Sequence, residues 1–250
     1  MRPFEFARDV FSRDGFTLLV DGQSQSHVDP GEPGRLFFEY VRRIGNVIDA
    51  FRIPGAPIRA LHLGGGGLSL PRYVEATRPG SSQVVVEHDG AMLDAVLARV
   101  PLPRDADLEL VVADARDAVA HRSDANADLV IVDLYTGLDP PAFVASSAFA
   151  ADVLAALAPD GLVVVNVADA AGLARLGAQA RAFVRNAPTA ELLVAGAPAI
   201  LAGAEDGNAI LVVAPGGLPA DLERRLAAAG PHPAGVLTRD RLDVVLWGSC

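Results

Sequence analysis

Three carboxylates and a run of glycines follow four apolar stretches, and their types and order are typical of nucleoside binding. The first stretch ends in four glycines at 64–67, the second in Glu87, the third in Asp114 and the fourth in Asp133. Glycines let backbone N–H groups approach a ligand closely, and the N-terminus of a following helix attracts polar ligand groups. The pattern therefore predicts a nucleoside site.

Each of these carboxylates has its own expected role. Glu87, at the tip of the second stretch, is placed to accept hydrogen bonds from the two hydroxyls of a ribose. Asp114 can accept a hydrogen bond from the exocyclic amine of adenine. Asp133 is expected nearest the reacting centre, where a carboxylate can take a proton from an amine or hold a cation. Each acid alone could instead cap a helix or loop, so the prediction depends on their joint occurrence.

Alternating strands and helices after residue 58 would bring these groups to one edge of a sheet. Strands are expected at 59–63, 83–87, 108–112, 128–133, 161–167, 209–214 and 242–247. Helices are expected at 68–78, 90–99, 115–121, 146–157, 171–186 and 219–229. Continuously apolar strands alternating with helices indicate an α/β fold: a Rossmann-like, mostly parallel sheet, here of seven strands, with helices on both faces. The last two strands could include an antiparallel edge pair.

The first 57 residues have a different pattern. Two short strand-like stretches flank Asp21-Gly22, a dipeptide typical of a β-hairpin. Apolar residues at spacings of three and four predict an amphipathic helix over 35–51. We therefore expect a hairpin-and-helix appendage over residues 1–57 and a single catalytic domain over 58–250. The helix could pack in the core or form the surface of a homodimer.

Composition excludes several classes of partner. The 21 basic and 31 acidic residues give a net charge of −10, which argues against nucleic acid and is compatible with a cationic small molecule. One cysteine, Cys250, builds no disulfide or thiolate metal site, and the five histidines show no metal-ligand spacing, so no metal is expected. No secretory signal or bilayer-spanning run is visible. We expect a cytoplasmic protein without a membrane partner.

The glycine run does not fit a dinucleotide site. The G-x-G-x-x-G fingerprint needs a third glycine for close helix packing, and here Leu70 and Pro71 stand where a pyrophosphate-binding helix would begin. Binding of NAD is therefore not expected.

Taken together, these motifs resemble the spermidine synthase family, over roughly residues 16 to 215. Residues 18–25 (LLVDGQSQ) are similar to the family's L-x-L-D-G-x-x-Q hairpin, and residues 64–69 (GGGGLS) to its G-G-G-D-G-G. Residues 86–89 (VEHD) resemble its V-E-I-D, residues 113–115 (ADA) its G-D-G/A, and residues 130–133 (VIVD) the start of its I-x-D-S-x-D-P. The resemblance implies the fold of class I S-adenosylmethionine-dependent methyltransferases.

The resemblance also implies roles for individual residues. The implied co-substrate is decarboxylated S-adenosylmethionine, held by Gln25, Gly64, Gly65, Gly66, Glu87, Asp114 and Ala115. Asp133 matches the acid that serves as base when an aminopropyl group passes to an amine acceptor in polyamine biosynthesis. Tyr135, Thr136 and Asp139 follow it and are candidates for the substrate side.

Three departures from the family pattern leave alternatives open. Gly67 replaces an acid that holds the ammonium of the aminopropyl group, and Phe37 replaces a tyrosine. Thr136 stands where a second acid is expected, unless Asp139 supplies it. The alternatives are an S-adenosylmethionine-dependent methyltransferase on the same scaffold, which would bind intact S-adenosylmethionine, and a non-catalytic nucleoside-binding homologue.

Overall fold

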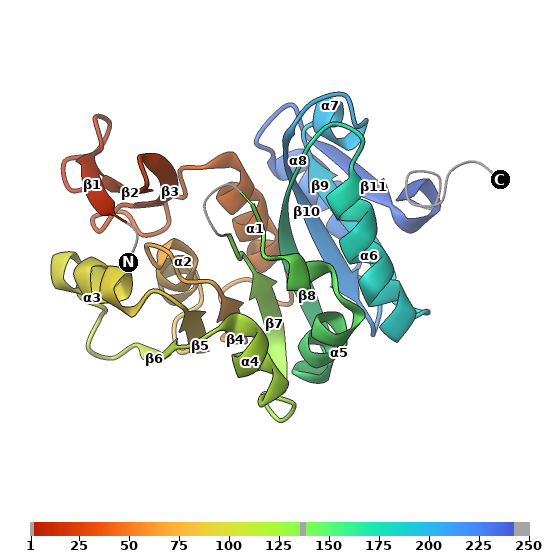
Figure 1. Cartoon of the computed structure of the whole chain (residues 1–250), viewed down its shortest axis with the longest axis horizontal. Helices are drawn as coiled ribbons and strands as arrows, with labels where there is room; N and C mark the ends of the chain where they lie inside the picture. Colours follow the sequence, from red (N-terminus) through yellow and green to blue (C-terminus); the bar gives the residue numbers. More distant parts are fainter. Residues whose placement is uncertain (1–2, 136–138, 243–250) are drawn as a thin grey trace.

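Residues 3–135 and 139–242 are described by the computed structural model of the chain, which contains two sheets. The larger has eight strands in the order β11-β9-β10-β8-β7-β4-β5-β6 (Figure 1). Its strands are β4 (Arg59–Leu63), β5 (Ser82–Glu87), β6 (Asp107–Val112), β7 (Ala127–Val132), β8 (Leu157–Asp169), β9 (Glu191–Gly196), β10 (Gly207–Ala214) and β11 (Gly235–Thr238). The five strands from β6 to β8 pair in parallel, whereas β10 is antiparallel to both β8 and β9.

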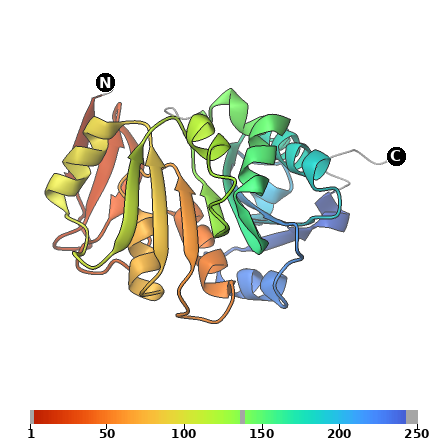
Figure 2. The same ribbon diagram turned by 90° about the horizontal axis from the view of Figure 1, so that it is seen from below.

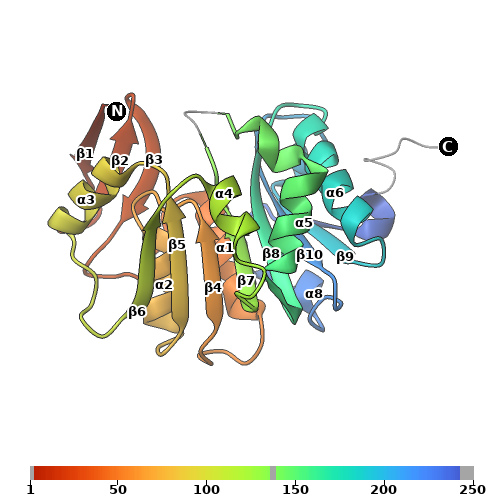
Figure 3. The ribbon, with the colours of Figure 1, turned by 60° about the horizontal axis from the view of Figure 1, so that its bottom comes forward.

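Helices cover both faces of this sheet because its strands alternate apolar side chains between two cores (Figure 3). On β7, for example, Val130 and Val132 face one core and Leu129 and Ile131 the other. The first core holds α4 (Ala115–Ala120), α5 (Ser147–Ala155) and α6 (Ala174–Asn186). The second holds α1 (Glu39–Ala50), α2 (Ser69–Thr77) and α8 (Leu222–Ala229). Two shorter helical segments are α7 (Pro198–Leu201) and a 3-10 turn (Ala142–Ala145).

The smaller sheet contains β1 (Phe4–Arg8), β2 (Phe16–Val20) and β3 (Gln23–Val28), all antiparallel. Both residues of the β2–β3 turn, Asp21 and Gly22, have positive φ angles of 51° and 74°, as a tight two-residue hairpin requires. Apolar residues of β1 and β2 pack with α3 (Gly90–Arg99), so this sheet lies at the β6 end of the molecule, opposite the last strands (Figure 2).

The predicted α/β class with helices on both faces is confirmed, and within the described residues the sheet has eight strands, where seven were expected. Strands β9 and β11 were not expected, because short apolar runs do not distinguish a strand from a buried helix. The strand expected at 242–247 lies, apart from Leu242, outside the described residues. The predicted hairpin is confirmed as β2–β3 and gains β1 as a third strand.

Helix α1 belongs to the apolar core of the large sheet, although it precedes residue 58. Its side chains Ile44 and Ile48 are fully buried in the same cluster as Leu129 and Val164 of the sheet. The division at residue 57 stays a prediction. None of the helices in the described ranges is long and apolar enough to cross a membrane.

Candidate functional site

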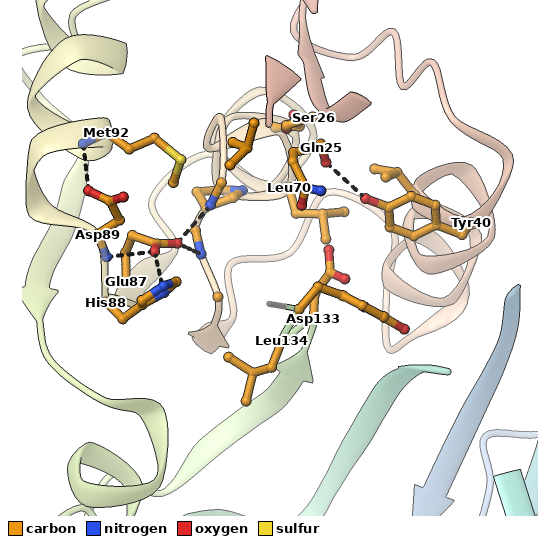
Figure 4. Close-up of a pocket in the computed structure, with 18 residues that line it drawn as sticks. Gln25, Ser26, Tyr40, Leu70, Glu87, His88, Asp89, Met92, Asp133 and Leu134 are labelled. Atoms are coloured by element: carbon orange, nitrogen blue, oxygen red, sulfur yellow. Dashed lines mark hydrogen bonds and ion pairs between the residues drawn. The ribbon is translucent and has the colours of Figure 1, made fainter. Parts of the chain in front are cut away.

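A cavity lies at the carboxyl ends of β4, β5 and β7, where the glycine run, Glu87 and Asp133 were predicted to meet (Figure 4). Its wall includes the glycine turn after β4, Glu87 at the end of β5, His88 directly after it, and Asp133 after β7. The second sheet contributes Gln25 and Ser26 of β3 from the opposite side. The site is therefore formed jointly by both sheets. The described residues that line it are Val20, Gln25, Ser26, Tyr40, Val41, Gly64, Gly65, Gly66, Ser69, Leu70, Pro71, Glu87, His88, Asp89, Met92, Asp133, Leu134 and Tyr135.

The glycine turn lies against the end of β7. Gly64 has a φ of 100°, and a Cβ there would come within 2.1 Å of the Asp133 carbonyl oxygen. No other residue type fits this close approach. The conformation of this turn therefore fixes the position of Asp133 relative to the loop.

Glu87 is 4% exposed and binds the loop with its carboxylate. The N–H groups of Gly65 and Gly66 donate to its Oε2 at 2.9 and 3.0 Å, and that of Asp89 donates to Oε1 at 2.9 Å. Burial alone would raise the pKa of Glu87, but these bonds and the contact of His88 Nδ1 with Oε1 at 2.9 Å lower it to about 2. Glu87 is thus charged at neutral pH. Its predicted contact with ribose hydroxyls stays a prediction.

The pKa of Asp133 is shifted in the opposite direction. It follows β7 and accepts a hydrogen bond from Asn166 Nδ2 of β8 at 2.8 Å. Burial and the negative charge of Glu87 raise the pKa of Asp133, and the bond from Asn166 lowers it; together they bring it to about 6. A carboxylate with this pKa is largely ionised at neutral pH and can both take and release a proton.

Two predicted adenine-side residues lie away from the cavity lining. Asp114 is exposed and caps α4, where its Oδ1 accepts a hydrogen bond from the Arg116 N–H at 2.8 Å. Ala115 begins the same helix and is buried in the core. Their proposed contact with adenine stays a prediction.

The three substrate-side candidates have different surroundings. The Tyr135 hydroxyl lines the cavity, but it donates to the Asn166 carbonyl at 2.9 Å and accepts from the Ala168 N–H at 2.6 Å. It therefore fastens the segment after β7 to β8. Asp139 pairs with Arg175 and is not among the lining residues. Thr136 falls outside the described residues.

Tyr40, Asn166 and Ser26 were not expected at the site. Tyr40 lines the cavity from α1, and its hydroxyl donates weakly to the Gln25 carbonyl at 3.4 Å. Its position was concealed by the apolar periodicity of the helix. Asn166 had a signal in the sequence, since it is the polar residue within the apolar run 162–167. Ser26 adjoins the predicted Gln25 but carried no signal of its own.

The space beside Gly67 is filled. A Cβ at this position would lie 2.9 Å from both Ser26 Oγ and Val28 Cγ2. Ser26 Oγ is itself 2.8 Å from Ser69 Oγ, whose hydroxyl donates to the His27 carbonyl at 2.6 Å. Gly67 thus packs tightly under β3, and an acidic side chain does not fit there unless the side chains of Ser26 and Val28 move.

The cavity has an anionic character. Its ionisable lining residues are three acids (Glu87, Asp89 and Asp133), two tyrosines and His88, and no arginine is among the described lining residues. Such a wall favours a cationic ligand. No group of three or more potential ligand residues that could hold a metal ion occurs in the parts of the chain that are described.

Comparison with solved structures identifies the architecture. A probable spermidine synthase from Corynebacterium glutamicum ATCC 13032 is 26% identical and superposes with a TM-score of 0.88, over 98% of this chain and 90% of that one. The chain has the fold of the spermidine synthases. The resemblance predicted from the motifs is confirmed, although no protein-family model and no curated protein matches the sequence.

Two more distant structures share the fold. A spermidine synthase in complex with the transition state analogue AdoDATO is 14% identical, with a TM-score of 0.66 over 98% of this chain and 85% of that one. Human methyltransferase-like protein 13 in complex with SAH is 21% identical, with a TM-score of 0.54 over 76% and 87%. The similarity to spermidine synthases therefore spans nearly the whole chain. The solved structures that resemble this chain are transferases.

Proposed function

We propose that this protein is a spermidine synthase-like transferase that moves an aminopropyl group from decarboxylated S-adenosylmethionine to an amine acceptor. The observation that carries the proposal is Asp133, a carboxylate with a pKa of about 6 in a cavity whose described lining has acids and no arginine. A sulfonium donor and an amine acceptor are both cationic, so this wall attracts both substrates. Neighbours that bind AdoDATO and SAH support a co-substrate of the S-adenosylmethionine type.

The proposed reaction is a direct displacement. Asp133 takes a proton from the bound ammonium, which leaves a neutral amine with a free electron pair. This pair attacks the carbon next to the sulfonium, a C–N bond forms, and the C–S bond breaks with its electrons going to sulfur. The second product is 5′-methylthioadenosine. Gln25, Gly64, Gly65, Gly66 and Glu87 hold the donor in this scheme, with Asp114 and Ala115 on the adenine side.

The test measures 5′-methylthioadenosine released from decarboxylated S-adenosylmethionine in the presence of putrescine and a panel of other amines. Asp133→Asn should reduce turnover at least 100-fold and leave binding of 5′-methylthioadenosine nearly unchanged, because proton removal contributes roughly this factor. Asp160→Asn is a matched control, since Asp160 is 73% exposed and pairs with Arg52 outside the cavity. Full activity of Asp133→Asn would exclude the assigned role. For the wild type, kcat/KM should fall below pH 6, where Asp133 becomes protonated.

A methyltransferase is the second candidate, and Gly67 favours it. Gly67 has no side chain to supply a carboxylate for the aminopropyl ammonium, and Ser26 and Val28 lie against this position. The absent charge would also not repel the carboxylate of intact S-adenosylmethionine. Calorimetry of both forms separates the candidates: tighter binding of the decarboxylated form supports aminopropyl transfer, and the reverse order supports methyl transfer. Binding without turnover of any acceptor would indicate a non-catalytic homologue.

A further inference from the structure

Two asparagine side chains connect Asp133 to strand β10. Asn166 Nδ2 donates to Asp133 Oδ1 at 2.8 Å, and Asn208 Nδ2 donates to Asn166 Oδ1 at 2.9 Å. Asn166 is 4% exposed in an otherwise apolar stretch of β8. A buried amide needs partners at both its oxygen and its nitrogen, and Asn166 has one at each.

The direction of donation along this chain of groups is set by Asp133. An ionised carboxylate can only accept hydrogen bonds, so Asn166 must present its NH2 group to it. Its carbonyl oxygen then faces Asn208 and requires a donor, which the Asn208 NH2 group supplies. Without that donor, the two orientations of the Asn166 amide become closer in energy, and one of them puts a carbonyl oxygen against the carboxylate.

The backbone holds both asparagines in place. Asn208 lies opposite Ala168 and Asn166 opposite Ile210 on the antiparallel strands β10 and β8, so the two asparagines are diagonal neighbours on one face of the sheet. The Tyr135 hydroxyl bonds the carbonyl of Asn166 and the N–H of Ala168. The main chain beneath the Asn166 amide is therefore fixed on both sides.

We propose that Asn208 is a positioning residue for the reaction, which orients the Asn166 amide so that its NH2 group faces Asp133. This role rests on the proposed function of Asp133 as a base. The other ionisable groups that act on Asp133 are Glu87 at the end of β5, Tyr40 of α1 and Tyr135. Glu87 is negatively charged and opposes ionisation of Asp133, and the tyrosines are neutral because their pKa values are raised by burial. Asn166 is thus the group that favours the ionised base.

The experiment follows the titration of Asp133 by NMR in protein labelled with aspartate carrying 13C at the side-chain carboxyl. The Asp133 signal is assigned by its loss in Asp133→Asn. Asn208→Leu keeps the size of the side chain without the donor, and should raise the Asp133 midpoint from about pH 6 by about one pH unit. Asn208→Asp, a polar variant of the same size, should raise it further, because Asn166 would turn its NH2 group toward the new carboxylate and because the new negative charge disfavours ionisation of Asp133. Ser24→Ala is the control, since Ser24 lines the same surface hollow as Asn208.

The outcomes separate this proposal from the proposed function. An unchanged midpoint in Asn208→Leu overturns the positioning role, and Asn208→Ala, which also lacks the donor and adds no charge, decides if Asn208→Leu does not fold. Where the protein is active, the acidic limb of kcat/KM should move with the NMR midpoint while the KM of the donor changes less than twofold. A shifted midpoint in a protein without transferase activity would contradict the proposed function and leave the role of Asn208 intact.

Discussion

Glu87 and Asp133 are carboxylates in the same cavity whose surroundings give them opposite pKa shifts. Three backbone N–H groups and His88 stabilise the charged form of Glu87, whereas Asp133 accepts a hydrogen bond from the Asn166 amide and lies near another negative charge. Burial raises the pKa of both groups, so the number of hydrogen-bond donors to each carboxylate accounts for the difference between their pKa values. Glu87 is suited to a permanent charge and Asp133 to proton exchange.

The charge of Glu87 should stabilise the fold in a pH-dependent way. The pKa of Glu87 falls from 4.5 to about 2 on folding, so its contribution is fully present above pH 4.5 and is lost as the pH falls toward 2. Glu87→Gln should lower the free energy of unfolding by about 1 to 3 kcal/mol at pH 7. In urea titrations the difference from the wild type should shrink by pH 3.

Glu32→Gln is the control for this substitution. The Glu32 side chain is 73% exposed, so its replacement should change the free energy of unfolding by less than about 0.5 kcal/mol at either pH. A loss in Glu87→Gln that is equally large at pH 7 and pH 3 would show that shape, and not charge, makes the contribution.

At this scale the sequence indicated which residues gather but not what each one contacts. Gln25, Glu87 and Asp133 were predicted from motif and strand-end position, and all three line the cavity. Asn208 lay beyond sequence reasoning, because it reaches the site through antiparallel pairing of β10 with β8. Pairing partners distant in the chain leave no local pattern.

Among the elements, α1 and α2 are joined by one buried arginine. Arg78 is 1% exposed and follows α2, and its guanidinium donates to the carbonyls of Ile48, Phe51, Ile53 and Ala56. Two of these carbonyls, of Ile48 and Phe51, are at the C-terminal end of α1, where helix carbonyls have no partner within the helix. The planar guanidinium of Arg78 carries several N–H donors in a fixed geometry, so one side chain can bond several carbonyls of such a cluster.

Arg78→Met should lower the free energy of unfolding by about 2 to 4 kcal/mol, since it leaves several buried carbonyls without donors. Arg78→Lys should recover only part of this loss, because an ammonium is a compact donor that does not span the four carbonyls. Urea titration measures both. Arg224→Met is the control, as the Arg224 side chain is 73% exposed. A full recovery in Arg78→Lys would mean that charge alone is required.

Most helices were predicted to within about three residues, because amphipathic periodicity and capping residues are local signals. Asp89, Asp114 and Ser146, for example, cap α3, α4 and α5 with their side chains. The role of Arg78 was not predictable, since the sequence Thr-Arg-Pro-Gly around it is typical of an exposed turn. Its burial depends on where the α1 end lies in three dimensions.

At the scale of the whole molecule, the small and the large sheet meet at the glycine turn after β4. Gly67→Ala should force Ser26 and Val28 of β3 away from the turn and lower the free energy of unfolding by about 1 to 3 kcal/mol. Val28→Ala creates space there, so the double variant should be less destabilised than the sum of the single ones by about 1 kcal/mol. Urea titrations of the three variants test this. Gly34→Ala is the control, because a Cβ there meets nothing within 4 Å. Strict additivity would contradict the contact.

The placement of Gln25 and Ser26 across the cavity from Glu87 couples ligand occupancy to attachment of the small sheet. A molecule in the cavity contacts β3 and the large sheet at once, and its binding therefore stabilises their association. By mass action, a ligand present at a hundred times its Kd, and bound only while both sheets line the cavity, adds about 2.7 kcal/mol to the free energy needed to separate the two sheets. The supply of substrate would then govern hydrogen exchange and proteolytic cleavage at the N-terminal end of the chain.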